Sequence, residues 1–215
     1  MKKLLTIVMA LAFAIQLSAQ TLTTVVGDST ATTSAKQIPA YVYYNHSYSQ
    51  SVYTASELGF SGEIKGIGYY HSSTQPTYNS GTWKIYMKEV TESSLSDFIV
   101  GSDFTEVYNG PAAWVVGSNT FTFTTPFMYT GLGNLLVAVI RDGNDYSTYP
   151  RFRHVNVGSS VYEYDDYEEF NINTPISYAS VTSSVPVVRF EITLPEGFCF
   201  PPTNVTCDNT TITSS

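Results

Sequence analysis

Hydrophobic and polar residues alternate in several runs along the chain, a pattern typical of β-strands with one buried face. Trp83, Ile85 and Met87 alternate with polar neighbours, and residues 185–194 repeat the pattern near the C-terminus. A period of two with one apolar face predicts antiparallel sheets packed on a core. Such runs, separated by Gly, Asn, Pro and Ser, predict strands at residues 38–44, 50–58, 63–71, 82–90, 119–127, 134–142, 151–157 and 185–194.

The run LLVAVI within residues 134–142 is apolar on both faces and predicts a central strand. No helix of more than a turn or two is expected, and residues 91–103 are the one stretch that could hold a helical turn. The 17 Tyr, 12 Phe and low charged fraction of 13% also favour β-structure. The chain is therefore predicted to be all-β, an antiparallel two-sheet β-sandwich of jelly-roll type over residues 38–195. Residues 142–150 and 158–181 are predicted to be long surface loops.

The N-terminus has the features of a secretory signal peptide. Lys2 and Lys3 precede an apolar run at residues 4–15, which is shorter than the roughly 20 residues that span a bilayer. We expect cleavage after Ala19, no membrane insertion, and a protein that is secreted or displayed on the cell surface. Gln20 stands where a lipoprotein would carry cysteine, so no lipid anchor is expected. Residues 20–37 predict a flexible leader or an irregular edge strand.

Charge and motifs exclude several functions. Loss of residues 1–19 removes two of the ten basic residues and leaves all 18 acidic ones, which makes nucleic acid an unfavourable partner. His46, His71 and His154 lie far apart and in no metal-binding pattern, and no Gly-x-Ser-x-Gly or phosphate-binding loop is present. No catalytic residue can be nominated, and the chain is predicted not to be an enzyme.

Two acidic stretches are candidates for calcium, the one cofactor considered. Asp142, Asn144 and Asp145 follow the predicted central strand and could hold a cation together with backbone carbonyls. Residues 162–170, hereafter the acidic segment, gather five carboxylates, but without the Asp-x-Asp-x-Asp-Gly spacing of a calcium loop. A simple turn and a solvated loop are the alternative interpretations of the two stretches.

Tyrosines in the predicted loops are candidates for ligand binding. Tyrosine faces can stack on sugars, and tyrosine-rich loops also recognise proteins at low entropic cost. Packing of the rings as loop anchors is the alternative. The candidate residues are Tyr146, Tyr149, Tyr162, Tyr164 and Tyr167.

Four segments in order resemble an N-terminal β-module of secreted and surface proteins of Bacteroidetes-type bacteria. They are Tyr48 to Gly59, Gly62 to Tyr70, Trp83 to Met87, and Thr125 to Val139. The resemblance is to modules found beside fibronectin type III and cleaved-adhesin-like domains, and it implies architecture and location without a catalytic site. It also implies that Ser29, in the triplet Asp-Ser-Thr, is a candidate O-glycosylation site.

The closing residues 196–215 resemble a linker and the incomplete start of a fibronectin type III domain. Cys199 and Cys207 are candidates for a disulfide, unless the position of Cys207 within a strand prevents pairing. We therefore expect further domains in the same polypeptide.

The leading functional hypothesis is a non-enzymatic adhesion module for a host or matrix protein. The alternative is a carbohydrate-binding accessory module of a secreted glycosidase or peptidase, for which the partner would be a glycan.

Overall fold

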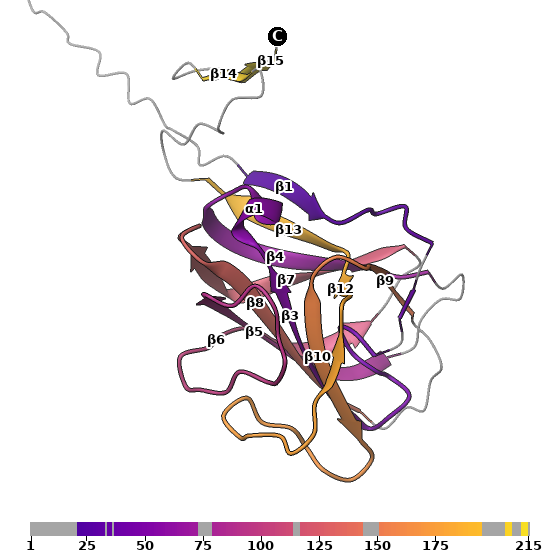
Figure 1. The fold of residues 1–215 in the computed structure, drawn as a ribbon. Helices are drawn as coiled ribbons and strands as arrows, with labels where there is room; N and C mark the ends of the chain where they lie inside the picture. The colour runs from indigo at the N-terminus through magenta and orange to yellow at the C-terminus, as the bar shows by residue number, and fades with distance from the viewer. Residues whose placement is uncertain are drawn as a thin grey trace, which may run out of the picture.

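Two antiparallel sheets form the body of the protein, as the computed structural model shows (Figure 1). The structure describes residues 21–32, 34–35, 37–72, 79–113, 117–143, 151–194, 205–207 and 212–214. The smaller sheet has the order β1 (Thr21–Val26), β13 (Val188–Thr193), β4 (Gly62–Tyr70), β7 (Ser118–Tyr129). The larger has the order β11 (Ser180–Thr182), β10 (Ser159–Asp165), β3 (His46–Tyr53), β8 (Asn134–Asp142), β5 (Asn79–Val90), β6 (Thr105–Ala113).

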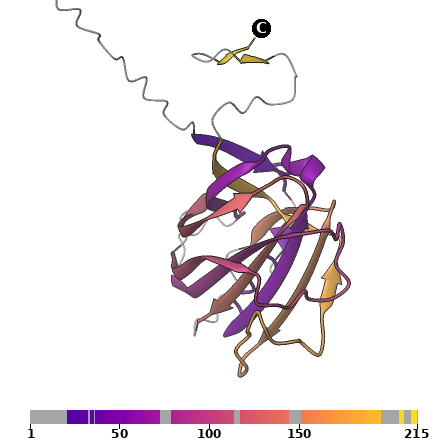
Figure 2. The ribbon, with the colours of Figure 1, turned by 90° about the vertical axis from the view of Figure 1, so that its left-hand side faces the viewer.

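The strand order confirms the predicted jelly-roll sandwich. Eight strands make up the sandwich, and we count them from first to eighth along the chain: β1, β3, β4, β5, β6, β7, β8 and β13. In this count the smaller sheet has the order first, eighth, third, sixth. The matching part of the larger sheet has the order second, seventh, fourth, fifth. This is the double Greek key of a jelly roll. The hairpin of β10 and β11 adds two strands beside β3, which Figure 2 shows as the orange edge of the larger sheet.

Six short elements of the described residues lie outside the two sheets. A small sheet joins β12 (Val185–Pro186), β9 (Phe152–Val155) and β2 (Ser34–Ala35). One helical turn, α1 (Ala55–Leu58), begins at Thr54, whose side chain accepts from the Glu57 amide in a capping box. Near the C-terminus β14 (Val205–Cys207) pairs antiparallel with β15 (Ile212–Ser214), within the stretch expected to begin a second domain.

The main core lies between the two sheets. Trp83, Ile85 and Met87 of β5 are completely buried, which confirms the alternation seen in the sequence. From the opposite sheet, Phe121 stacks on Trp83 with ring centroids 5.2 Å apart. Phe190 of β13 packs edge-on against Tyr53 of β3. Aromatic side chains of this size contribute much of the apolar area that stabilises a sandwich.

A second core covers the outer face of the larger sheet. Leu136, Ala138 and Ile140 of β8 are buried there, whereas their neighbours Leu135, Val137 and Val139 belong to the main core. Strand β8 therefore has two buried faces and lies between β3 and β5, as predicted for a central strand. Irregular segments 91–104 and 166–179 provide the cover, with Leu95, Phe98, Phe104, Phe170 and Ile172 among the side chains that pack on it.

The structure corrects three predictions about irregular regions. Residues 20–37 are not a flexible leader throughout, because Thr21–Val26 form β1 and pair with β13, so the alternative of an edge strand is correct for this part. Residues 158–181 are not one surface loop, because they contain β10 and β11. Residues 91–103 hold no helical turn and instead cross the second core.

Candidate functional site

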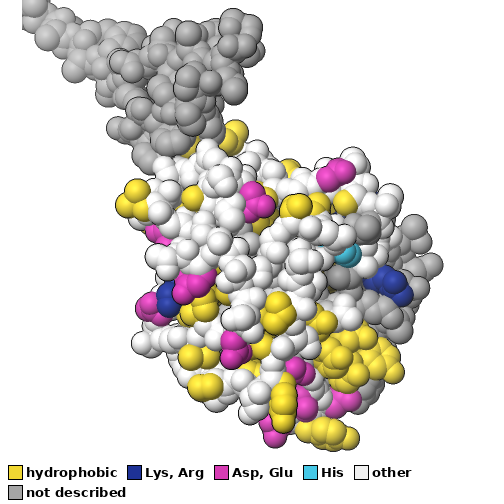
Figure 3. Space-filling model, in the orientation of Figure 1, with side chains coloured by type: hydrophobic (Ala, Val, Ile, Leu, Met, Phe, Trp, Pro, Cys, Tyr) yellow, Lys and Arg dark blue, Asp and Glu magenta, His cyan; other side chains and the backbone are white. Residues whose placement is uncertain are grey.

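Five tyrosine side chains lie together at the surface where β10 ends. Tyr41, Tyr43 and Tyr44 come from the segment before β3, and Tyr162 and Tyr164 come from β10; we call these five residues the tyrosine cluster. Tyr164 is at its centre, stacked on Tyr44 with ring centroids 4.3 Å apart and edge-on to Tyr41 at 5.0 Å. Figure 3 shows hydrophobic side chains, tyrosine included, gathered at the lower right of the molecule with acidic side chains beside them.

Two serines of β3 position the segment that carries three of these rings. Ser47 and Ser49 are buried on the face of β3 that is directed inward. The Ser49 hydroxyl donates to the Pro39 carbonyl at 2.5 Å, and the Tyr41 amide donates to the Ser47 hydroxyl at 3.1 Å. Because small hydroxyl side chains leave room and hydrogen-bond the backbone, an irregular segment can lie on this face of the sheet.

Residues 38–44 are therefore not the strand that the alternation predicts. Ile38, Ala40 and Val42 are buried, so the alternation correctly reports one buried side. The backbone, however, bonds to serine side chains of β3 and not to a neighbouring strand.

Buried Arg141 fixes the end of the same segment. Its Nη1 donates to the Tyr44 carbonyl and to the Asn45 carbonyl, the latter at 3.1 Å. Asn45 is also tied to the end of β10, because its amide and its Nδ2 donate to Asp166 at 3.2 and 3.0 Å. These contacts join the two halves of the tyrosine cluster.

Packing of the rings affects their acidity. Partial burial raises the pKa of the Tyr164 phenol above its ordinary value, and the neighbouring Tyr162, Tyr41 and Glu163 add to the effect. Burial is also the main cause of the raised pKa of Tyr44, with further contributions from Tyr164 and Asp166. Tyr44 and Tyr164 thus present neutral phenols at neutral pH, with hydroxyl groups able to donate and accept hydrogen bonds.

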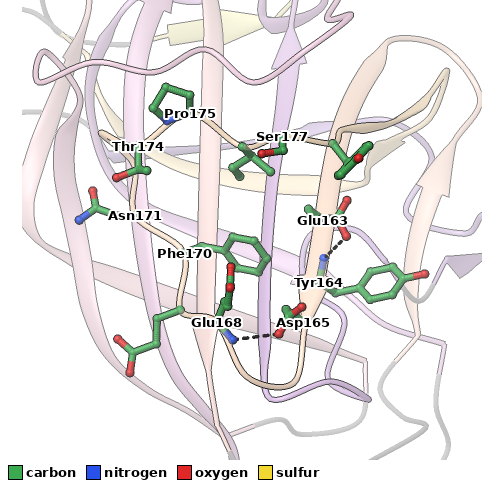
Figure 4. Close-up of a pocket in the computed structure, with 12 residues that line it drawn as sticks. Glu163, Tyr164, Asp165, Glu168, Phe170, Asn171, Thr174, Pro175 and Ser177 are labelled. Atoms are coloured by element: carbon green, nitrogen blue, oxygen red, sulfur yellow. Dashed lines mark hydrogen bonds between the residues drawn. The ribbon is translucent and has the colours of Figure 1, made fainter.

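A pocket of about 370 Å³ opens beside the cluster, between the end of β10 and residues 168–178 (Figure 4). Glu163, Asp165 and Glu168 line it together with the apolar surfaces of Phe170 and Ile176. Asp165 accepts from the amides of Tyr167 and Glu168 at 2.6 and 2.8 Å, and these bonds lower the pKa of its carboxyl group. The lining of the pocket is therefore partly acidic and partly apolar.

The structure brings together only part of the predicted tyrosine set. Tyr162 and Tyr164 are in the tyrosine cluster, but on strand β10 and not in a loop. Tyr167 follows in the turn after β10 with 93% of its surface exposed. Tyr146 and Tyr149 lie outside the described residues.

Sequence reasoning missed Tyr41, Tyr43 and Tyr44 as site residues, because it assigned them to a strand. The signal available was the run YVYY, in which three tyrosines crowd four positions.

The predicted calcium and disulfide sites are mostly outside the described residues. Asp142 is described, and its carboxylate contacts His46 Nδ1 at 2.9 Å and Lys84 Nζ at 3.3 Å, partners that compete with a cation. Asn144 and Asp145 are not described, so the calcium site stays a prediction. Within the described ranges, no three His, Cys, Asp or Glu side chains are placed to hold a metal ion.

Cys199 is outside the described residues and Cys207 lies in β14, so the disulfide also stays a prediction. The candidate glycosylation residue Ser29 is in the turn after β1. The neighbouring Asp28 accepts there from the amide and hydroxyl of Thr30 at 2.8 and 2.6 Å. This turn leaves Ser29 part-exposed.

Comparisons with known proteins give no relative to guide the assignment: no protein-family model and no curated protein matches the chain. In the described part of the chain, no helix has the length and apolar character needed to cross a membrane.

Proposed function

We propose that this chain is a non-enzymatic, secreted or cell-surface binding module of a larger bacterial protein, and that the tyrosine cluster is its ligand-binding face. The observation that carries the proposal is the network of stacked and edge-on contacts among five surface tyrosines from two distant segments. Tyrosine offers a large contact area with little conformational entropy to lose, and prepositioned rings lose less still. Export rests on the signal-peptide features of residues 1–19.

A carbohydrate-binding accessory module is the second candidate. Tyr43 is 43% exposed, so part of its side chain can contact a sugar. Asn45 and Asp166 beside the cluster carry the amide and carboxylate groups that commonly hydrogen-bond sugar hydroxyls, although here they also bond each other. This alternative predicts the same face and a different ligand.

The test is a parallel screen of the mature chain against a glycan array and against immobilised extracellular-matrix proteins. We expect a ligand whose binding is lost in Tyr43→Ala and in Tyr164→Ala. Leu132→Ser is the matched control, because Leu132 is 94% exposed and lies in the β7–β8 turn, at the opposite end of β8 from the cluster. If all three variants bind the ligand as well as the parent does, the tyrosine cluster is not the binding face. If the chain binds neither a glycan nor a matrix protein, the proposal itself is overturned.

A further inference from the structure

The tyrosine cluster adjoins a surface with a strong and one-sided charge. The acidic segment, which contains Tyr162 and Tyr164, also contributes the carboxylates, and the sequence between Arg153 and Arg189 contains no Lys or Arg. Two cations lie near the other half of the cluster: Arg151, whose charge acts on the Tyr41 phenol, and buried Arg141, whose Nη1 donates to the Tyr44 carbonyl. The carboxylates are those of Glu163, Asp165, Asp166, Glu168 and Glu169.

We propose that this surface binds a basic segment of a polypeptide partner, with Arg or Lys side chains placed on the tyrosine rings and against the adjoining carboxylates. The inference rests on the proposed function and names its partner by chemistry. A guanidinium or ammonium group is attracted to the face of an aromatic ring, and Arg stacks on such faces particularly well. The rings carry the interaction, and the charge beside them selects a cationic occupant over a neutral or anionic one.

The pocket beside Tyr164 matches the two-part character of these side chains. Lys and Arg have apolar stems and charged ends, so they fit a site lined by both apolar surfaces and carboxylates. Phe170, Ile176 and Tyr178 are among the apolar lining residues, and Glu163 and Glu168 are among the acidic ones. Figure 4 shows Phe170 between Glu163 and Glu168. Tyr178 is 82% exposed, which leaves its ring accessible to a partner.

The probe is a synthetic peptide of alternating Arg and Gly, compared with the same peptide carrying citrulline in place of Arg. Citrulline keeps the planar shape and removes the charge, so the pair isolates the cation. Affinity for the mature chain is measured by calorimetry at low and at physiological salt. We expect the Arg peptide to bind at least about tenfold more tightly than the citrulline peptide, with affinity falling as salt rises.

Two charge-matched variants separate this site from general attraction to an acidic protein. Glu168→Gln with Glu169→Gln removes two exposed carboxylates of the acidic segment and should weaken binding about tenfold, as two surface ion pairs would. Glu63→Gln with Glu92→Gln removes the same charge elsewhere and should change affinity less than about twofold. Tyr178→Ser, which keeps the charge, should weaken binding about threefold or more through loss of the ring.

Three results would overturn the inference: equal affinity for the Arg and citrulline peptides, equal losses in both charge-matched variants, or a neutral saccharide that binds through the same tyrosines. Failure of the inference and failure of the proposed function can be told apart. If the screen of glycans and matrix proteins yields a ligand that depends on Tyr43 but the Arg peptide does not bind, only the inference falls. If neither experiment yields a ligand, both fall.

Discussion

Replacement of Arg141 by Met tests whether a buried guanidinium positions the tyrosine cluster. The change keeps an unbranched side chain and removes the hydrogen bonds from Nη1 to the Tyr44 and Asn45 carbonyls. The Asn45 carbonyl retains the Gly143 amide, 2.8 Å away, so the Tyr44 carbonyl suffers the larger loss. Hydrogen bonds from charged donors contribute about 1.5–3 kcal/mol each, and one compensated partner brings the expected loss of unfolding free energy to about 2–4 kcal/mol.

The assay is thermal unfolding combined with near-ultraviolet circular dichroism. For a domain of this size a loss of about 3 kcal/mol lowers the midpoint by roughly 6–12 °C. The dichroism of the stacked pair Tyr44–Tyr164 should fall already in the native state, because the loop that carries Tyr44 loses its anchor. Arg141→Lys, which keeps the charge and a donor, should lose less.

The opposing effect is the desolvation of the guanidinium, whose side chain is fully buried. Removal of a buried charge can be neutral or even stabilising when an apolar side chain fills its place. A midpoint for Arg141→Met that is unchanged or raised, with the tyrosine dichroism intact, would refute the reasoning. The position of residues 41–45 would then have to come from the serine contacts alone.

Three further outcomes follow from packing and burial. Gly81→Ala should lower the unfolding free energy, measured with urea, by at least about 2 kcal/mol, because φ is +86° and a Cβ would lie 2.1 Å from the Asp142 carbonyl oxygen. Gly117→Ala is the control: φ is also positive but no atom lies near the added Cβ, so the loss should be about 1 kcal/mol. Leu136→Ala should cost about 2–5 kcal/mol by the same measurement, since it leaves a cavity in the second core; a value below 1 kcal/mol would show that the covering loops do not pack tightly. Burial raises the pKa of the Tyr69 phenol and raises that of Tyr129 to about 12. The contribution of the two protonated phenols to stability is therefore fully present below pH 10, the ordinary pKa of tyrosine, and is lost as pH rises toward the raised pKa values. A thermal midpoint independent of pH between 9 and 11.5 would contradict this.

Strands with a regular pattern of hydrophobic residues could be predicted from the sequence. Trp83, Ile85 and Met87 face one core, and their alternation alone gives the strand and its buried side. Strand β8 was equally clear, because an apolar run on both faces has few locations in a sandwich other than the centre of a covered sheet.

Strand β10 could not be recognised in the same way. Tyr162 and Tyr164 alternate with Glu163 and Asp165, so over its second half neither face of the strand is aliphatic. This half lies near the sheet edge and projects beyond the core, where both faces reach solvent. A period-two pattern needs one buried side to be visible, and here burial ends at Val161.

The candidate site was the least predictable feature, since it depends on which strands become neighbours. Tyr44 meets Tyr164 because β10 pairs antiparallel with β3, with Tyr164 opposite Ser47. No local pattern near either tyrosine encodes that register. The serines of β3 looked like ordinary polar positions of a strand, and their role as hydrogen-bond partners of a covering segment required the three-dimensional structure.

The burial of both faces of β8 affects how its amide hydrogens can exchange with solvent. Both faces of this strand are buried and both edges are hydrogen-bonded, to β3 and to β5, so its amides have no route to solvent through fraying. Exchange of the amide hydrogens of Leu136, Ala138 and Ile140 for deuterium should therefore require global unfolding, whereas those of β11 at the sheet edge should exchange through local opening. The slowest amides of β8 would then report the unfolding free energy of the whole sandwich.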